Sequence, residues 1–480
     1  MKKIKLLLTL LVVVFSSCSE EIMNNIDTNP NQINNAPLKT LLPQVQVSYV
    51  VEIAGGGTAI NTYFLSEQNT FVLGNNVLLG VQGMGEQVWS QGYQALNDLE
   101  ILKRNALESN APTYAGIADV LRAFNLAALT DLFGDIPYSE ALRSDVANPA
   151  FDKSETLYPE IQKILDEAIA NLQKDSGPLT PRTDDLFFGG NKTLWIKTAY
   201  GLKARLFNRL SNLDPTGSAN NALGAIAQSF SSDAEGFSFN RFTDLNTNGN
   251  PFSVAQNGQP QSAVGNGIYN TMVSFTPTGK VEEDPRANIW FTKVKGQLLA
   301  APNGTARPDF GEPRLDGAFY SKPELFKFFR APMPLLTFTE LKFIEAEANL
   351  RLNNPTKAYE AYRTAVTLAL GRAGDFNPAV RLTTAQINAY LQLEKVSPGA
   401  NKLSLQDIIF QRYIYFYQFQ PLEAYNDVRR TGLFNVTDPT GRANRIPYPV
   451  SELTRNSKTP KDIDNNSTFE ARTKVFWAKK

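Results

Sequence analysis

Apolar residues recur at three- and four-residue spacings over much of this 480-residue chain, and no other feature constrains its fold more. The longest such stripe runs from Tyr114 to Leu132 and is followed by Gly134 and Pro137. This spacing places side chains on one face of an α-helix, and glycine and proline are typical of helix ends. The sequence therefore predicts a helix over residues 113–132.

The same periodicity predicts further helices. One begins after Ser154, and another carries a leucine stripe from Leu194 to Leu210, with Trp195 beside it. Trp89, Tyr93 and Asn97 follow one another at four-residue spacing. This spacing places them on one side of a helix, and we expect that side to face the core.

Residues 339–352 and 354–370 predict two helices joined by a tight turn. Asn354 suits the capping position, Pro355 suits the first helical position, and Gly371 suits the stop. Small and aromatic residues lie where the two helices must approach closely, as in a tetratricopeptide-like repeat of about 34 residues.

A weak capping box, Ser404 with Asp407, predicts one more helix in the second half of the chain. Between the helical stretches lie segments 69–86, 231–285 and 296–335, which are rich in Gly, Asn, Pro and isolated aromatic residues and do not predict helix. Long insertions of this kind on a rigid scaffold are where binding surfaces are usually placed.

The chain contains no histidine, which excludes Ser-His-Asp and Cys-His catalysis and most zinc catalysis. A hydrolase that uses paired Asp or Glu stays open. The charge is balanced at 47 basic and 47 acidic residues, with no Lys/Arg cluster, so nucleic acid is not an expected partner.

The first eighteen residues have the order of an export signal. Three lysines precede the apolar run Leu6–Phe15, which is too short to span a membrane and is followed by Ser16, Ser17 and Cys18. The stretch resembles a bacterial lipobox, in which the cysteine is lipidated and becomes the mature N-terminus. The alternative is an ordinary signal peptide with an incidental cysteine. The acidic residues after Cys18 resemble the surface-export signal of Bacteroidetes lipoproteins.

These segments predict three parts. Residues 1–17 form a lipoprotein signal peptide, residues 18–40 form a lipidated flexible tether, and residues 41–480 form a single helical domain. No second long apolar run follows Cys18, so nothing after it is expected to cross a bilayer.

Six sequence blocks in one order behind the lipobox resemble the SusD/RagB family of nutrient-binding outer-membrane lipoproteins, and its second SusD-like subgroup in particular. No block is specific alone, but together they span nearly the whole mature chain. The blocks are residues 27–31 (DTNPN), 129–138 (LTDLFGDIPY), 199–205 (AYGLKAR), 343–348 (FIEAEA), 425–430 (YNDVRR) and 446–449 (IPYP).

The resemblance implies an all-α fold of tetratricopeptide-like helix pairs that form a superhelical scaffold with long irregular loop insertions. It implies a lipid-anchored protein on the outer membrane, facing the cell exterior, that captures oligosaccharide and delivers it to a SusC-like TonB-dependent transporter barrel. It implies no catalysis and no cofactor. Some family members capture peptides instead, and a peptide ligand therefore stays open.

Glycan capture needs flat aromatic faces with amide, carboxylate or guanidinium groups beside them. We therefore expect such residues in, or directly after, the aromatic and amide-rich segments that do not predict helix. The candidate ligand-binding residues are Asn69, Phe71, Asn75, Asn76, Asn250, Phe252, Asn266, Tyr269, Asn270, Asp284, Arg286 and Trp290.

Asp244, Asn246 and Asn248 match the first half of a calcium-binding loop, with oxygen ligands at alternate positions and a glycine after them. Ala255 stands where such a loop requires Glu, so the match is only half a motif. A third class of function, a pure scaffold in which the helix pairs bind another protein, also stays open.

Overall fold

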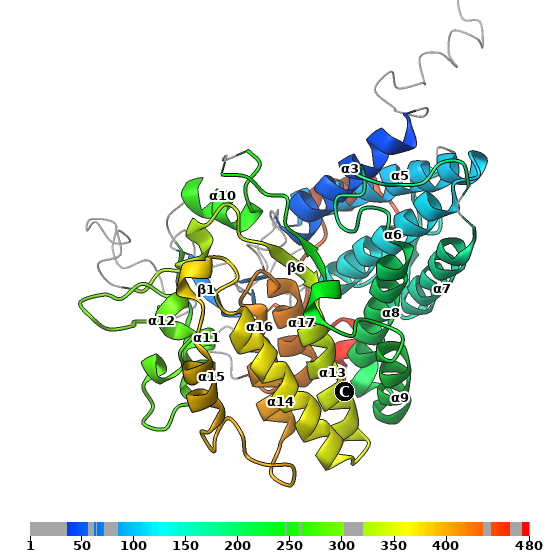
Figure 1. Ribbon diagram of the computed structural model, residues 1–480. Helices are drawn as coiled ribbons and strands as arrows, with labels where there is room; N and C mark the ends of the chain where they lie inside the picture. The colour runs from blue at the N-terminus through cyan, green and yellow to red at the C-terminus, as the bar shows by residue number, and fades with distance from the viewer. Residues whose placement is uncertain are drawn as a thin grey trace, which may run out of the picture.

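The computed structural model, drawn in Figure 1, describes residues 36–55, 62–63, 65–71, 85–143, 145–175, 177–244, 247–258, 262–301, 320–434, 443–460 and 473–479. The predicted signal peptide, Cys18 and the tether as far as residue 35 lie outside the described residues. The first helix of the described residues begins at Leu38, earlier than the predicted start of ordered structure near Leu41.

Helices dominate the described residues and confirm the all-α fold class. Each predicted helix is present within one or two residues of its expected bounds. The helices are α3 (Leu38–Ser48), α5 (Glu86–Glu108), α6 (Pro112–Phe133), α7 (Ser154–Gln173), α8 (Lys192–Arg209), α9 (Pro215–Ile226), α10 (Pro251–Gly258), α11 (Asn266–Val273), α12 (Ala287–Trp290), α13 (Phe338–Arg351), α14 (Pro355–Arg372), α15 (Thr384–Leu391), α16 (Leu405–Phe416), α17 (Pro421–Thr431) and α18 (Val450–Arg455).

Three short two-stranded antiparallel sheets connect segments that are distant in the sequence. Their register pairs Asn69 with Val264, Ile136 with Asp152, and Phe237 with Leu336. The sheets are β1 (Asn69–Phe71) with β5 (Ser262–Val264), β2 (Ile136–Pro137) with β3 (Phe151–Asp152), and β4 (Phe237–Phe239) with β6 (Met333–Leu336).

Consecutive helices pack as neighbours along the chain. Helix α5 contacts α6, α6 contacts α7, α8 contacts α9, and α13 contacts α14 (Figure 1). The predicted helix pair is confirmed in α13 and α14, but two details differ. Asn354 occupies the capping position without a side-chain cap bond, and Gly371 lies inside α14, which continues to Arg372.

The capping box of α16 is confirmed. Ser404 Oγ accepts a hydrogen bond from the backbone N–H of Asp407, and Asp407 Oδ2 accepts one from the backbone N–H of Ser404 at 2.9 Å. The reciprocal bonds satisfy two backbone donors that the helix itself leaves open.

Segment 231–285, which did not predict helix, contains α10 and α11. Each is only eight residues long, so neither shows more than two turns of apolar periodicity. Helix α11 forms because its inner face packs on α16 and on β1, a tertiary contact that local sequence does not encode.

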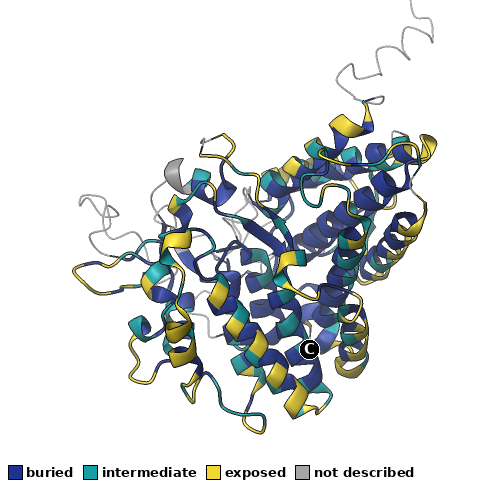
Figure 2. Ribbon diagram, viewed as in Figure 1, coloured by how far each residue is buried: buried dark blue, intermediate teal, exposed yellow. Residues whose placement is uncertain are grey.

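The apolar faces of the helices meet in one large core, and the buried residues are dark blue along the ribbon in Figure 2. Trp89 and Trp195 are both buried there, as their spacing predicted. The outer faces of α7, α9 and α14 are exposed (Figure 2).

Buried ion pairs join the helices at the centre of this core. Arg205 on α8 makes two bonds of 2.6 Å to the carboxylate of Glu340 on α13. Arg209, one turn further along α8, bonds to Glu423 on α17 at 2.6 Å and lies 3.4 Å from Asp131 on α6. Four helices thus share one chain of charges.

A second group of charges continues this chain. Glu347 on α13 bonds to Arg412 on α16 at 2.8 Å and to Arg430 on α17 at 2.6 Å, and both arginines also bond to Asp427. Although burial alone would raise the pKa of Glu347, the charges of Arg430, Arg412 and Arg351 hold it well below its ordinary value. We call these two groups together the buried ion network.

The C-terminal segment closes this network. Trp477 is fully buried, and its indole N–H donates to Asp131 at 3.1 Å beside a 2.5 Å bond from the hydroxyl of Tyr158. Nothing in the sequence around Trp477 indicates this contact, because its nearest neighbours in the chain show no pattern. Burial raises the pKa of Asp131, although Arg209 opposes that shift.

We predict that Glu347→Gln lowers the free energy of unfolding by about 3–5 kcal/mol at pH 7, because it leaves buried arginines without their shared carboxylate. The depressed pKa of Glu347 stabilises the fold fully above the unfolded-state pKa of about 4.3, and this contribution is lost as the pH falls below it. The difference between wild type and variant should therefore shrink between pH 6 and pH 3 in urea titrations.

Glu345→Gln is the matched control. Glu345 lies on the same helix but is partly exposed and bonds to Lys342 one turn away, so its loss should cost under about 1 kcal/mol. Equal costs for the two variants, or a difference that grows at low pH, would contradict a role for Glu347 as the shared anion.

Candidate functional site

A cavity of about 230 Å³ lies between α11 and α16 and is closed on one side by the turn before β1. We call it the α11–α16 cavity. Its lining residues are Ser66, Glu67, Gly267, Asn270, Thr271, Gln406, Phe410, Tyr413, Leu433 and Phe434.

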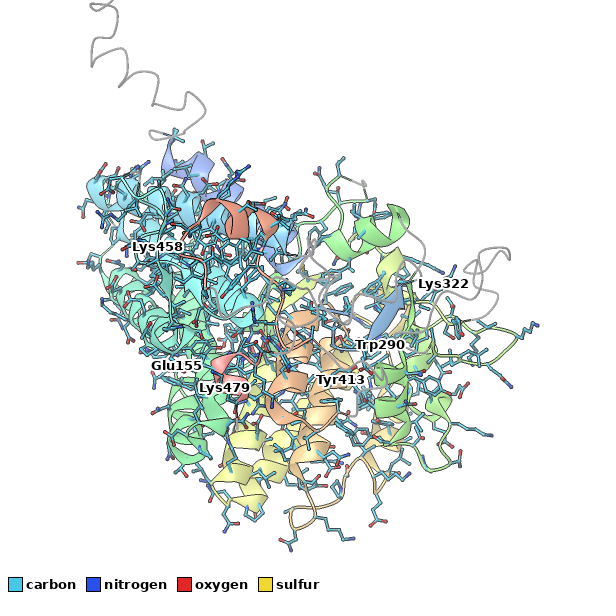
Figure 3. The ribbon with its side chains drawn as sticks, turned by 180° about the vertical axis from the view of Figure 1, so that it is seen from behind. Glu155, Trp290, Lys322, Tyr413, Lys458 and Lys479 are labelled. Atoms are coloured by element: carbon cyan, nitrogen blue, oxygen red, sulfur yellow. The ribbon has the colours of Figure 1, made fainter. Side chains whose placement is uncertain are left out.

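Three aromatic rings form one wall of the α11–α16 cavity. Phe410 and Tyr413 lie on α16, and Phe434 follows the end of α17. The ring centroid of Phe434 is 4.8 Å from that of Phe410 and 4.6 Å from that of Tyr413. Tyr413, labelled in Figure 3, is buried, whereas the two phenylalanines are half-buried and keep part of their surface accessible.

Polar groups border this aromatic wall. Asn270 on α11 and Gln406 in the first turn of α16 are exposed. Among the described residues neither side-chain amide has a hydrogen-bond partner, so both can bond to a ligand. Thr271 differs, because its hydroxyl donates to the carbonyl oxygen of Gly267 at 2.7 Å.

Side-chain hydrogen bonds fix the turn before β1 against α16. The hydroxyl of Tyr413 donates to the carbonyl of Ser66 at 2.7 Å, and the amide of Gln68 donates to the carbonyl of Tyr413 at 2.9 Å. The hydroxyl of Tyr417 donates to Asn69 Oδ1 at 2.8 Å. Burial raises the pKa of the Tyr417 hydroxyl well above its ordinary value, so it stays protonated and remains a donor.

The backbone at this turn is unusually close-packed. Glu67 has a φ of 61°, which is uncommon for a residue other than glycine. A Cβ at Gly267 would lie 2.6 Å from the carbonyl oxygen of Glu67 and 2.8 Å from the hydroxyl of Tyr413. The absence of a side chain at Gly267 therefore lets α11 approach this wall, and the cavity is largely preformed.

Asn250 and Phe252, two of the predicted ligand residues, lie in the interior. Asn250 is 0% exposed, donates to the carbonyl of Ala331 at 2.9 Å and accepts from the N–H of Phe252 at 3.0 Å. The ring of Phe252 packs on Tyr63 and Phe326. We therefore assign both residues to the core rather than to a ligand site.

The predicted group Asp284, Arg286 and Trp290 is also buried, and all three side chains are 0% exposed. Arg286 makes bonds of 3.0 and 2.7 Å to the carboxylate of Asp284 and also bonds to Tyr390 and Gln411. The indole N–H of Trp290, labelled in Figure 3, donates to the carbonyl of Ala373. These three residues therefore belong to the core and not to a ligand site. The sequence does not show this, because a neighbouring acid and base can neutralise each other in the core as well as on a surface.

The first predicted cluster is only partly described. Asn69 is fully buried and accepts the Tyr417 bond described above, so it joins β1 to the end of α16 rather than to a ligand. Phe71 lies in β1, but its side chain is outside the described residues, as are Asn75 and Asn76.

The remaining candidates lie together on α11. Asn266 and Tyr269 are half-buried, and Asn270 is exposed and lines the cavity. Asn270 is thus the one described candidate that the structure brings into the α11–α16 cavity. Burial and the charge of Glu282 raise the pKa of Tyr269, which keeps its hydroxyl neutral.

Sequence reasoning missed most of the cavity. Phe410 lies on α16, a helix that the sequence predicts to be rich in apolar residues. The spacing of apolar residues along a helix does not tell an accessible aromatic ring from a buried one. Phe434 follows Gly432, which ends α17 with a φ of 64°, and a lone aromatic after such a stop was the only available signal. Glu67 and Gln406 carried no signal.

Of the calcium candidates, Asp244 forms a 2.7 Å ion pair with Arg330, both largely exposed. The backbone N–H of Thr243 donates to the carbonyl of Asn248, which closes the turn. Asn246 lies outside the described residues. Calcium binding here stays a prediction from the sequence.

A second cavity of about 360 Å³ lies beside the start of α3, but its lining contains only one aromatic ring, Tyr114, whose hydroxyl donates to Asp184 at 2.6 Å. We therefore prefer the α11–α16 cavity as the candidate site. Among its lining residues Glu67 is the single carboxylate, whereas a glycoside hydrolase needs two carboxyl groups about 5–9.5 Å apart.

Comparison with known proteins agrees with this fold. The sequence model of the second SusD-like family, described as starch-binding and associating with the outer membrane, matches residues 30–451. The chain belongs to the SusD-like family. No curated protein matches it. Within the described residues, no helix has the length and apolar character needed to cross a membrane.

Solved structures of this family share the fold. A SusD/RagB family protein from Bacteroides thetaiotaomicron has a TM-score of 0.81 at 24% identity, over 92% of this chain and 99% of that one. A chitin-binding SusD homologue from Flavobacterium johnsoniae has a TM-score of 0.71 at 19% identity, over 92% and 98%. A SusD homologue from Bacteroides fragilis has a TM-score of 0.72 at 21% identity, over 93% and 100%.

We predict that Gly267→Ala displaces the wall of the cavity and weakens ligand binding about tenfold, because its Cβ has no room beside Glu67 and Tyr413. Gly224→Ala on α9 is the control, since a Cβ there meets nothing within 4 Å and should stabilise the helix by about 0.5–1 kcal/mol. Thermal unfolding and ligand titration of both variants check this. Unchanged binding in Gly267→Ala would show that this wall does not shape the site.

Proposed function

We propose that this protein is a cell-surface lipoprotein that binds oligosaccharide and delivers it to a TonB-dependent transporter without chemical change. The observation that carries the proposal is the aromatic wall of Phe410, Phe434 and Tyr413 beside the unpartnered amides of Asn270 and Gln406. A sugar ring has an apolar C–H face and a rim of hydroxyls, and this arrangement offers a partner for each.

The size of the cavity favours part of a chain over a complete small molecule. Its volume of about 230 Å³ is below the range of about 300–1,000 Å³ that is typical of pockets enclosing drug-sized ligands. We infer that one sugar unit occupies it while the rest of the oligosaccharide lies along the surface. A capture protein that must release its cargo gains from such limited enclosure, because little ligand surface has to be rehydrated on release.

Family membership supports the location. The family is described as associating with the outer membrane, and residues 1–18 resemble a lipobox, which would supply the anchor at Cys18. We propose that the lipid holds the domain on the outer face of that membrane. The partner is then a SusC-like transporter barrel, which supplies the energised step that a passive binding domain lacks.

The chitin-binding homologue supports a glycan as cargo, although at 19% identity its ligand is a guide to chemical class only. A glycoside hydrolase is disfavoured because the described lining of the cavity holds one carboxylate, whereas that reaction uses two. A peptide is the alternative cargo, and a panel of short peptides is therefore titrated beside the oligosaccharides.

We predict that the mature domain binds at least one member of a panel of neutral oligosaccharides in isothermal titration, and that Phe410→Ala weakens this binding about tenfold or more through loss of stacking. Tyr269→Ala is the matched control, because Tyr269 is an aromatic residue of α11 that is not part of the cavity lining. Its affinity should stay within about twofold of wild type.

The same titrations decide against the proposal if binding is seen only with peptides, if no ligand binds, or if a bound oligosaccharide is cleaved. Circular dichroism of both variants shows whether the domain is folded, so a loss of affinity in Phe410→Ala is not mistaken for unfolding.

We predict that Cys18→Ser abolishes lipid attachment and releases the protein from the membrane fraction, because a hydroxyl does not replace the thiol in lipoprotein processing. Mass spectrometry of the N-terminal peptide and membrane fractionation check this. An unmodified Cys18 in the native protein would contradict the anchor.

A further inference from the structure

The rim of the α11–α16 cavity offers a more specific recognition than hydroxyl binding. Asn270 and Gln406 project from two different helices that both line the cavity. Each primary amide carries two N–H donors and one carbonyl acceptor, and none of these groups is engaged by another described residue. A ligand that presents one acceptor and one donor close together would satisfy both.

The aromatic wall beside these amides has no free polar side-chain atom where it is accessible. Phe410, Phe434 and Leu433 present only carbon, and the hydroxyl of the nearby Tyr413 is already committed to the carbonyl of Ser66. A ring substituent that is a hydroxyl would lose its water here without a replacement partner. A methyl group would instead be buried favourably against the two rings.

These two requirements describe a secondary amide that ends in a methyl group. We propose that Asn270 and Gln406 are the specificity-determining residues of this site and that they recognise the acetamido group of an N-acetylated amino sugar. The proposal rests on the oligosaccharide-binding function above and deepens it. The acetamido N–H and C=O bond to the two side-chain amides, and its methyl group packs on Phe410 and Phe434.

The charge of the lining fits this neutral group. The described lining contains no lysine or arginine, so it offers no cation for a uronate or a sulfated sugar. Glu67 is its one acidic residue, and it would favour a free amine over an acetamide if charge governed selection. The acetylated and deacetylated forms of one sugar therefore separate recognition by the amides from recognition by charge.

Three β-1,4-linked tetramers test the proposal by isothermal titration: those of N-acetylglucosamine, glucose and glucosamine. They share a backbone and differ at one ring position, which carries an acetamide, a hydroxyl or an amine. We expect the N-acetylglucosamine tetramer to bind at least about tenfold more tightly than either of the others, because a site built to bond an amide rejects analogues that lack it.

Two variants connect this selectivity to the residues. Gln406→Glu keeps the shape but removes both N–H donors, and Asn270→Leu removes the whole amide. Each should weaken binding of the N-acetylglucosamine tetramer about five- to tenfold, and binding of the glucose tetramer by about twofold or less. Asn221→Leu, an exposed position on α9 outside the cavity, is the matched control and should change neither.

The outcomes separate this proposal from the general one. Equal binding of all three tetramers, tighter binding of the glucosamine tetramer, or equal weakening of the acetylated and glucose tetramers in the variants would overturn acetamide recognition while oligosaccharide binding stands. Binding of an acetyl-capped tetra-alanine peptide in place of every sugar would overturn both.

Discussion

The architecture depends on the buried ion network, because it is the contact at which helices distant in the sequence meet. Asp131 comes from α6, Arg205 and Arg209 from α8, Glu347 from α13, and Asp427 from α17. Burying this many charges costs desolvation free energy, and such groups add little net stability compared with apolar residues of the same shape. They do, however, penalise every packing that leaves one charge unpaired. We infer that the network selects one arrangement of the helices rather than adding stability.

Helix α16 transmits that arrangement to the candidate site. Its Arg412 belongs to the network, its Gln411 bonds to Arg286, and its Phe410 and Tyr413 form the cavity wall. Residues 410–413 of α16 thus contact three different parts of the protein: the cavity, Arg286 and the buried ion network. A rotation of α16 would therefore break buried hydrogen bonds. The aromatic wall is therefore preorganised, and a ligand need not supply the free energy to order it.

The sequence predicted the scaffold well for a physical reason. The helices that carry long apolar stripes, such as 113–132, have a periodicity that survives any arrangement of their neighbours. The blocks that carried the family resemblance turn out to hold Asp131, Arg205, Glu347 and Asp427, so they mark the buried ion network. The block at residues 425–430 also supplies Arg430, which bonds to the buried carboxylate of Glu347.

The site was less predictable because exposure is a tertiary property. Trp290 and Phe252 are aromatic residues with amide or charged neighbours, as expected of a sugar-binding site, but the core encloses them. Phe410 belongs to a helix rich in apolar residues and yet lines a cavity. Asn270 was identified because its cluster on α11 happens to face α16. Periodicity reports which residues share a face, but not what covers that face.

We infer that the buried ion network holds the aromatic wall in place before a sugar binds. A crystal structure of the mature domain with a bound oligosaccharide tests this inference. We expect one sugar ring against Phe410 and Phe434, with the backbone of α16 and of residues 65–71 unchanged from the ligand-free protein. A sugar bound elsewhere on the surface, or a cavity that forms only when ligand is present, would contradict it.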